Sequence, residues 1–362
     1  MNHFKKNPVS MAVAATVAGF LTVGTAQAID YEVWAADQSN STPSIPAKGT
    51  DGSLLWIWDG AAVNTYAAGP STGTQPAALP CNAGNTPGPC DLHAIFPGTL
   101  DEFSSDAAGA AIADTTLNLS DVGPIARLHG AIPDPQHRSV NMNMFAPGNG
   151  FVGIISADTK EAISLYRVSK TNAPSGGGRS LHMSFWNADG SQLLLANLHG
   201  RILERIDIVR DDQGTITGTT FNQAASVGMG SETAIVETAK VYLGTTNGGA
   251  NTMIGDIAGA YSAGATSLTY TDTSGAIICK QDSTSAGLEC PHASLPGAIS
   301  GDRGGNVIVC PIVSSDNKVY VTFGGGGLII VDADTPAGGA MKIVGAYGKA
   351  SINGAGCGGV EI

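Results

Sequence analysis

The chain has 362 residues, a formal net charge of −12 and only 13% charged residues, while glycine fills 49 positions. Nucleic acids and anionic membrane surfaces are recognised by basic faces, and no run of arginine or lysine in this chain could supply one, so we expect neither as a partner. Abundant glycine with neutral polar residues is typical of short strands joined by tight turns.

The first 28 residues have the pattern of a secretory signal peptide. Lys5 and Lys6 precede an apolar run from Val9 to Val23, and Ala26-Gln27-Ala28 forms a small-residue cleavage site. The run is shorter than the roughly 20 residues that span a bilayer, which favours cleavage over a retained anchor. We therefore expect an exported protein, periplasmic or extracellular, with one domain over residues 29–362 and no membrane insertion.

Two strands are expected near the start of this domain, at Tyr31 to Ala36 and at Leu54 to Asp59. Their tryptophans, Trp34, Trp56 and Trp58, are expected to pack between sheets rather than to form a sugar-binding platform. The residues after Asp59 carry little periodicity and much glycine, proline, serine and threonine. We interpret them as an irregular blade with a long insertion at about 60–127.

A unit that occurs twice identifies the repeat of the fold. Leu193-Leu194-Leu195-Ala196-Asn197, a turn at Gly200 and a second strand from Arg201 to Asp207 correspond to Val319-Tyr320-Val321-Thr322-Phe323, a turn through Gly324 to Gly327, and Leu328 to Asp332. A short strand and a polar turn precede each copy. The unit is therefore predicted to be three antiparallel strands, which is most of a propeller blade.

Looser copies begin near Phe151 and near Val241, so the spacing between successive copies is that of four-stranded blades. With strands A, B and C numbered outward from the propeller axis, the inner A strands are expected at His137 to Phe145, Leu181 to Trp186 and Asn306 to Pro311. The predicted fold is all-β, a propeller of six or seven four-stranded blades.

The two ends of the chain are expected to close the ring. Tyr31 to Ala36 and Leu54 to Asp59 have the pattern of strands B and C without a strand A, whereas Cys357 to Ile362 has that of a strand A alone. Together they would complete one blade. The alternative is a fragment of a longer propeller that lacks its last blade.

Six cysteines in an exported chain predict disulfides. Cys81 and Cys90 flank a turn-forming loop, Cys279 and Cys290 flank another, and by elimination Cys310 pairs with Cys357 on neighbouring inner strands. A cysteine and histidine metal cluster at Cys290-Pro291-His292 is disfavoured, because a second closely spaced pair of ligands is missing.

The segment from His182 to Asn197, which contains Trp186-Asn187-Ala188-Asp189-Gly190-Ser191 followed by Leu195-Ala196-Asn197, resembles the repeat of the YVTN and lactonase-like β-propellers. That superfamily also takes in the selenium-binding, methanethiol-oxidase-like proteins and the propeller of nitrous oxide reductase. The resemblance implies a propeller with a site near its axis. The copper-binding histidine motifs of the two metalloenzyme families are not recognisable here.

Histidines are the main candidates for a site at one face of the propeller. His137 and His182 lie at or near the start of expected A strands and form the strongest pair, while His129 and His292 lead into such strands. His199 lies in a B to C turn that we expect to be too far from the axis to join the others. Imidazole binds copper or zinc and acts as a general base. Loops at the same face would add Asp37, Asp134 and Asp158. The alternative is that these histidines are unrelated surface or hydrogen-bonded residues, because polar side chains gather in loops anyway.

Two functions follow from these patterns. The first is a non-enzymatic exported propeller that binds a protein or a small ligand at its axial face. The second is a copper- or zinc-dependent propeller enzyme, methanethiol-oxidase-like or a lactonase-type hydrolase, that uses the histidines His129, His137, His182 and His292. No serine or cysteine lies in a sequence that resembles the nucleophile elbow of a hydrolase.

Overall fold

The computed structural model describes residues 31–38, 54–69, 74–81, 88–96, 127–145, 150–171, 178–228, 235–243, 255–256, 269–271, 277–280, 307–324, 328–334 and 341–347. The predicted signal peptide at 1–28, the predicted closing strand at 357–362 and His292 lie outside these residues. In the described part, no helix has the length and apolar character needed to span a bilayer.

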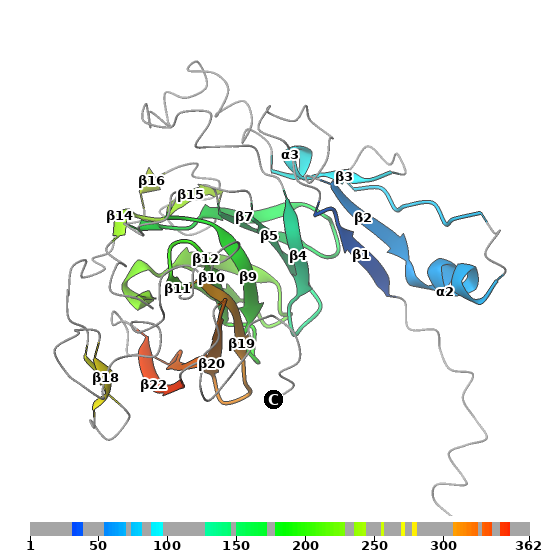
Figure 1. The fold of residues 1–362 in the computed structure, drawn as a ribbon. Coiled ribbons are helices and arrows are strands. Elements are labelled where there is room, and N and C mark those ends of the chain that lie inside the picture. Colours follow the sequence, from blue (N-terminus) through cyan, green and yellow to red (C-terminus); the bar gives the residue numbers. More distant parts are fainter. Residues whose placement is uncertain are drawn as a thin grey trace, which may run out of the picture.

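The described residues are mostly β and form several antiparallel sheets (Figure 1). The N-terminal sheet holds β1 (Glu32–Ala36), β2 (Leu54–Asp59) and β3 (Cys90–Asp91) in that order. The β4 sheet begins with β4 (Leu128–Pro133), β5 (Ser139–Met144), β6 (Phe151–Ser156) and β7 (Ala162–Arg167), followed by β15 (Lys240–Leu243) and β16 (Gly255–Asp256).

The other two large sheets are meanders of consecutive strands. The β9 sheet holds β9 (Leu181–Trp186), β10 (Gln192–Asn197), β11 (Ile202–Arg210) and β12 (Ile216–Phe221), with β13 (Val227–Gly228) also paired to β11. The β19 sheet holds β19 (Ile308–Val313), β20 (Lys318–Phe323), β21 (Leu328–Asp332) and β22 (Lys342–Tyr347). Small ladders pair β8 (Lys170–Thr171) with β14 (Ile235–Glu237), and β17 (Thr269–Thr271) with β18 (Ile277–Lys280).

The duplicated unit of the sequence is confirmed as a repeated structure. Leu193 pairs with Ile206 across β10 and β11, and Val319 pairs with Val331 across β20 and β21. In both copies a preceding strand, β9 or β19, completes three antiparallel strands, and a fourth strand follows. Four consecutive antiparallel strands are the form of a propeller blade.

The strand assignment before Phe151 is wrong by one strand. The expected inner strand from His137 to Phe145 is β5, the second strand of its sheet, and β4 lies at the edge beside it. Gly130 and Pro133 weaken the strand pattern of β4 in the sequence. The structure accommodates them with a register shift between Leu128 and Gly130 and with Pro133 as the last residue of an edge strand.

The expected blade start near Val241 is also wrong. β15 pairs with β7, with Val241 opposite Tyr166, and so extends the β4 sheet instead of opening a new one. The chain thus forms the whole β9 sheet before β15 adds a further strand to the β4 sheet, which began earlier in the sequence. The spacing of repeats along a sequence does not reveal a strand that pairs with an earlier sheet.

The region after Asp59 contains a helix that the sequence analysis did not predict. Helix α2 (Gly60–Ala68) begins directly after β2, and the Asp59 carboxylate accepts a hydrogen bond from the Ala62 amide at 2.7 Å. Asp at the N-cap and several alanines are favourable helix signals, which the interpretation as an irregular blade overlooked. A short helix, α3 (Leu92–Ile95), and a 3₁₀ turn, η1 (Gln223–Ala225), complete the described helices.

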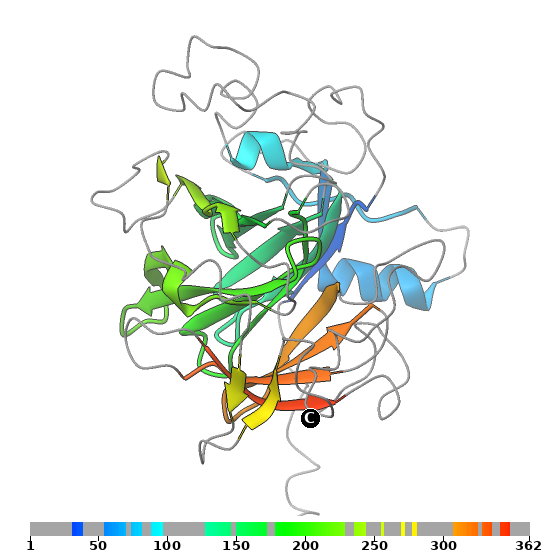
Figure 2. The same cartoon turned by 60° about the vertical axis from the view of Figure 1, so that its left-hand side comes forward.

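The four large sheets pack face to face in chain order (Figures 1 and 2). Leu55 and Ile57 of the N-terminal sheet share a hydrophobic core with the β4 sheet. A second core lies between the β4 and β9 sheets, and a third lies between the β9 and β19 sheets. Strand β10 is buried on both faces, because Leu193 and Leu195 face the β4 sheet while Leu194 and Ala196 face the β19 sheet. This explains its unbroken apolar run.

Two cysteine predictions fall within the described residues. The disulfide predicted between Cys81 and Cys90 is present, with Cα atoms 5.3 Å apart, and ties the segment after α2 to β3. Cys310 in β19 is also disulfide-bonded, while its expected partner Cys357 lies outside the described residues. The expected pair of Cys279 and Cys290 is not tested, because Cys290 lies outside them as well.

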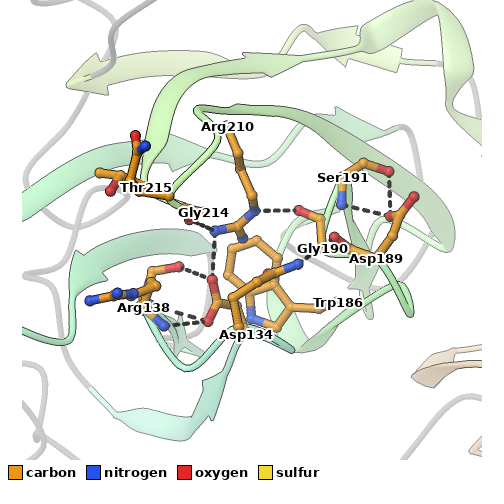
Figure 3. Close-up of polar contacts among 12 residues, drawn as sticks. Asp134, Arg138, Trp186, Asp189, Gly190, Ser191, Arg210, Gly214 and Thr215 are labelled. Atoms are coloured by element: carbon orange, nitrogen blue, oxygen red, sulfur yellow. Dashed lines mark hydrogen bonds and ion pairs between the residues drawn. The ribbon is translucent and has the colours of Figure 1, made fainter.

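A buried ion pair joins the β4 and β9 sheets at their turns (Figure 3). Asp134, which follows β4, has a fully buried side chain and contacts Nη1 of Arg210 from β11 at 2.7 Å. The Asp134 carboxylate also accepts hydrogen bonds from the Arg138 and Ser139 amides and from the Ser139 hydroxyl. Arg210 donates to the carbonyls of Gly190 and Gly214 and lies over Trp186. Both charges are therefore compensated and hydrogen-bonded.

We expect the substitution Asp134→Asn to destabilise the protein by about 3 to 5 kcal/mol, because it leaves the Arg210 guanidinium buried without its counter-charge. Urea denaturation of the variant measures this loss. The matched control is Asp158→Asn, which removes an exposed ion pair with Arg138 at 3.0 Å and should cost less than about 1 kcal/mol. Equal losses in the two variants would contradict a stabilising role of the buried pair.

Candidate functional site

Two of the four predicted histidines occupy equivalent positions on neighbouring strands. His129 is the second residue of β4 and His182 is the second residue of β9, and each follows a leucine. Each strand then leads into a turn held by a polar side chain, Asp134 or Asn187, that accepts a hydrogen bond from the start of the next strand. This equivalence places the two imidazole rings side by side, with centroids 4.4 Å apart.

Further side chains gather around this pair, and we call the group the histidine end. The Phe145 ring lies 5.4 Å from His129, 5.7 Å from His182 and 6.3 Å from His199, measured between ring centroids. The Arg127 guanidinium lies over the Phe145 ring at 4.6 Å. His199 comes from the β10 to β11 turn and lies near the same Phe145 ring, so the expectation that it cannot join the other histidines is wrong.

The asparagine of the repeat motif positions this end. Asn197 Oδ1 accepts hydrogen bonds from the Ser180 and Gly200 amides, while its Nδ2 donates to the Ser169 carbonyl and to Glu204. A Cβ atom at position 200 would lie 2.5 Å from the Asn197 side chain, so the turn requires glycine there. Ser180 in turn holds His199 through a 2.8 Å hydrogen bond to its Nδ1 atom.

Glu204 is the buried acid of this network. Its carboxylate accepts hydrogen bonds from the Ser169 amide at 3.2 Å and from Asn197 at 3.1 Å. Burial raises the pKa of Glu204 to about 7, because desolvation of the charged form outweighs those hydrogen bonds and the nearby Arg179. The carboxyl group therefore titrates near neutral pH, inside the network that positions His199.

The remaining predicted site residues lie elsewhere. His137 is exposed in the turn between β4 and β5, at the opposite end of β4 from His129. The prediction that His137 and His182 form a pair is therefore wrong, because it rested on the incorrect assignment of β5 as an inner strand. His292 lies outside the described residues.

Two of the three predicted carboxylates lie away from the histidines. Asp134 is buried against Arg210 and Asp158 is paired with Arg138, both at the turns opposite the histidine end. Asp37 follows β1, and the neighbouring Gln38 donates a hydrogen bond to the His129 carbonyl. Among the residues that the structure describes, no group of three or more His, Cys, Asp or Glu side chains is arranged to hold a metal ion.

A pocket with a volume of about 880 Å³ lies between the N-terminal sheet and the β4 sheet. Its lining includes Tyr31 and Trp34 from the first sheet and Ala131, Pro133 and His137 from the second. Sequence reasoning missed this pocket, because it forms between segments that are about 100 residues apart in the chain. The tryptophan and carboxylates near Tyr31 are the signal that could have indicated it.

The pKa of Glu204 predicts a pH dependence of stability. The unfolded chain loses the proton near the ordinary value of 4.5 and the folded chain near 7, so the folded state binds more protons between these values. Stability should therefore fall as pH rises from 4.5 to 7, on the order of 3 kcal/mol in total. In denaturation curves across this range, Glu204→Gln should lose that slope, whereas the exposed control Glu161→Gln should keep it. Parallel pH profiles for the two variants would contradict this assignment.

Comparisons with known proteins give structural likenesses alone. No family model matches the chain, and no curated protein matches it. Similar solved structures include a putative 6-phosphogluconolactonase from Bacteroides uniformis, with 10% identity over 61% of this chain and 57% of that one and a TM-score of 0.25. The chain thus spans little more than half the length of that protein.

Two further similar structures show likenesses of the same size. The WD40 domain of coronin from Toxoplasma gondii has 11% identity over 88% of this chain and 76% of that one, with a TM-score of 0.25. The periplasmic gluconolactonase of Pseudomonas aeruginosa has 11% identity over 63% and 72% of the two chains, with a TM-score of 0.20. At such identities and TM-scores, the similarities do not establish a family.

Proposed function

We propose that this chain is an exported, non-enzymatic β-propeller that binds a small anionic ligand at the histidine end. The observation that carries the proposal is the convergence of His129, His182 and His199 on Phe145, from two neighbouring sheets. Four-stranded meanders that stack face to face support the propeller, with six or seven blades as the expected number. The signal-peptide pattern and the Cys81 to Cys90 disulfide support export.

The charges near the histidine end favour an anion. Its described cations are mainly arginines: Arg127 before β4, Arg167 at the end of β7, Arg179 before β9 and Arg201 in the β10 to β11 turn. Glu237 is ion-paired with Arg179 at 2.6 Å and with Lys170 at 3.6 Å, and Glu204 is protonated in part at neutral pH. Asp37, beside Gln38, is a third acid near this end, so the described cations still outnumber the acids. Such an excess in a chain with a net charge of −12 would select for a negatively charged ligand.

The ring-bearing side chains suit a ligand with a flat apolar part. Phe145 and the two imidazoles present aromatic edges and faces, and such rings prefer tilted or edge-to-face contacts. An aromatic carboxylate combines this flat body with a negative charge. Benzoate is therefore a suitable probe, and inorganic phosphate tests the contribution of charge alone.

A second candidate function is a copper or zinc site, favoured by the 4.4 Å separation of the His129 and His182 rings. Two imidazoles so close could both bind one ion, and further ligands would have to come from residues outside the described part of the chain. This candidate corresponds to the metal-dependent propeller enzyme that the sequence analysis kept as an alternative. It differs from the first candidate in requiring stoichiometric metal.

Titration of the mature chain separates these candidates. With histidines labelled for NMR, benzoate should shift the ring signals of His129, His182 and His199 and leave His137 unchanged. The variant His182→Gln should weaken benzoate binding by about tenfold, because it removes one hydrogen bond to a charged ligand. His137→Ala is the matched control, since it removes an exposed histidine at the opposite end of β4.

Two results would overturn the first candidate. One is that benzoate shifts no histidine signals, or shifts His137 as strongly as the others. The other is that the purified mature protein holds one equivalent of copper or zinc which His129→Gln and His182→Gln lose and His137→Ala retains. That second result would establish the metal site instead.

A further inference from the structure

We propose that the pocket between the N-terminal sheet and the β4 sheet binds an organic cation, a primary amine with an apolar body. The pocket is lined by Ala131 and Pro133 near the end of β4, whereas the histidine end lies at the start of that strand. Its volume of about 880 Å³ falls in the range of small-molecule sites. The site is therefore separate from the one proposed above.

The charges of the lining favour a cation. Three carboxylates, Glu32, Asp59 and Asp158, face the pocket together with a single lysine, Lys160. Glu32 is paired with Lys160 and Asp158 is paired with Arg138. Within the described residues Asp59 has no ion-pair partner, and its recorded polar contact is the helix-capping hydrogen bond from the Ala62 amide. An anionic ligand would meet uncompensated negative charge here, whereas an ammonium group would neutralise it.

The pocket wall already holds one ammonium group, that of Lys160. Its Nζ atom lies 2.6 and 2.8 Å from the two carboxylate oxygens of Glu32 and 5.0 Å from the centroid of the Trp34 ring. The Trp34 Nε1 atom donates to the same Glu32 carboxylate at 2.8 Å. Carboxylate and aromatic face together are the groups that recognise ammonium ligands in proteins. Glu32 and Trp34 thus already bind one ammonium group, that of Lys160, in the way proposed for the ligand.

Tyr31 and Asp59 supply a second aromatic ring and a second carboxylate to the pocket lining. The Tyr31 ring packs so closely on Gly60 that a Cβ atom there would lie 2.4 Å from it, and Gly60 directly follows Asp59. The Gly60 amide also donates to the Tyr31 carbonyl at 2.8 Å. The Tyr31 ring therefore lies against the residue that follows Asp59, and an ammonium group of the ligand that paired with the Asp59 carboxylate would lie on the same side of the pocket as this ring.

The rest of the lining defines the body of the ligand. Leu79, Ala131, Pro133, Val140 and Ala157 supply apolar wall. Burial of apolar ligand surface against such walls adds affinity in proportion to its area, and the ammonium group sets the orientation. An arylalkyl amine of modest size fits this combination, and 2-phenylethylamine is the probe that we choose.

Calorimetric titration of the mature chain at pH 7 and low salt tests the proposal. We expect saturable binding of 2-phenylethylamine, weaker by about tenfold or more for its uncharged analogue 2-phenylethanol, because the alcohol lacks the ion pair. Asp59→Asn should weaken amine binding to a similar degree. Asparagine caps a helix as well as aspartate does, so this variant removes the charge and keeps the cap of α2. Tyr31→Leu should also weaken amine binding.

The charge-matched control is Asp212→Asn, an exposed acid in the turn after β11 that lies outside the pocket lining. It should bind the amine as the unchanged chain does. The proposal is overturned if no amine binding is detected, if 2-phenylethanol binds as tightly as the amine, or if Asp59→Asn and Asp212→Asn have the same effect. None of these results bears on benzoate binding at the histidine end, which is measured separately.

Discussion

The structure depends on burying both faces of each sheet against a neighbouring sheet. A single four-stranded meander has two apolar faces here, as the alternate leucines of β10 show, and it cannot cover either by itself. In the stack, each sheet is covered by the next one, from the N-terminal sheet to the β19 sheet. Each sheet is then stabilised mainly by its neighbours in the stack, which is the energetic pattern of repeat proteins.

This constraint leaves the ends of the strands as the places where polar chemistry can vary. Side chains in the middle of β5 and β9 still make hydrogen bonds between the sheets, for example from Asn141 to the Ser184 hydroxyl at 2.8 Å. At one end of these strands, the turns carry two ion pairs, Asp134 with Arg210 and Arg138 with Asp158. At the other end, β4 and β9 begin with histidines. The two ends of the stacked strands therefore differ: ion pairs lie at one end and histidines lie at the other.

The repeat could be predicted from the sequence where its strands follow one another. Leu193 to Asn197 and Val319 to Phe323 have strong apolar patterns and glycine turns, and both were placed correctly as strands within meanders. The same reasoning failed at β4, because Gly130 and Pro133 interrupt its pattern, and at β15, because a strand can return to an earlier sheet. Helix α2 was not predicted because the residues after Asp59 show little periodicity, and the Asp59 cap is its clearest signal.

The candidate site could be predicted in part for the same reasons. His182 was placed correctly near the start of the first strand of its sheet, since the motif that follows it is well formed. His129 was placed only in a segment leading into a strand, and the error of one strand then paired His182 with His137. The equivalence is visible in the sequence once the turns are aligned, because Leu128-His129 precedes Asp134 by the same spacing as Leu181-His182 precedes Asn187.

In the β19 sheet the equivalent turn residue is Ser314, whose hydroxyl accepts a hydrogen bond from the Lys318 amide. The position equivalent to His129 and His182 is therefore Val309, which packs with Met183 and Cys310. A fold built from repeats offers the same position in every unit, and this chain places imidazole in two adjacent units and an apolar side chain in the next. Because the backbone does not require histidine at that position, its presence in both neighbouring units points to a role for the imidazoles themselves.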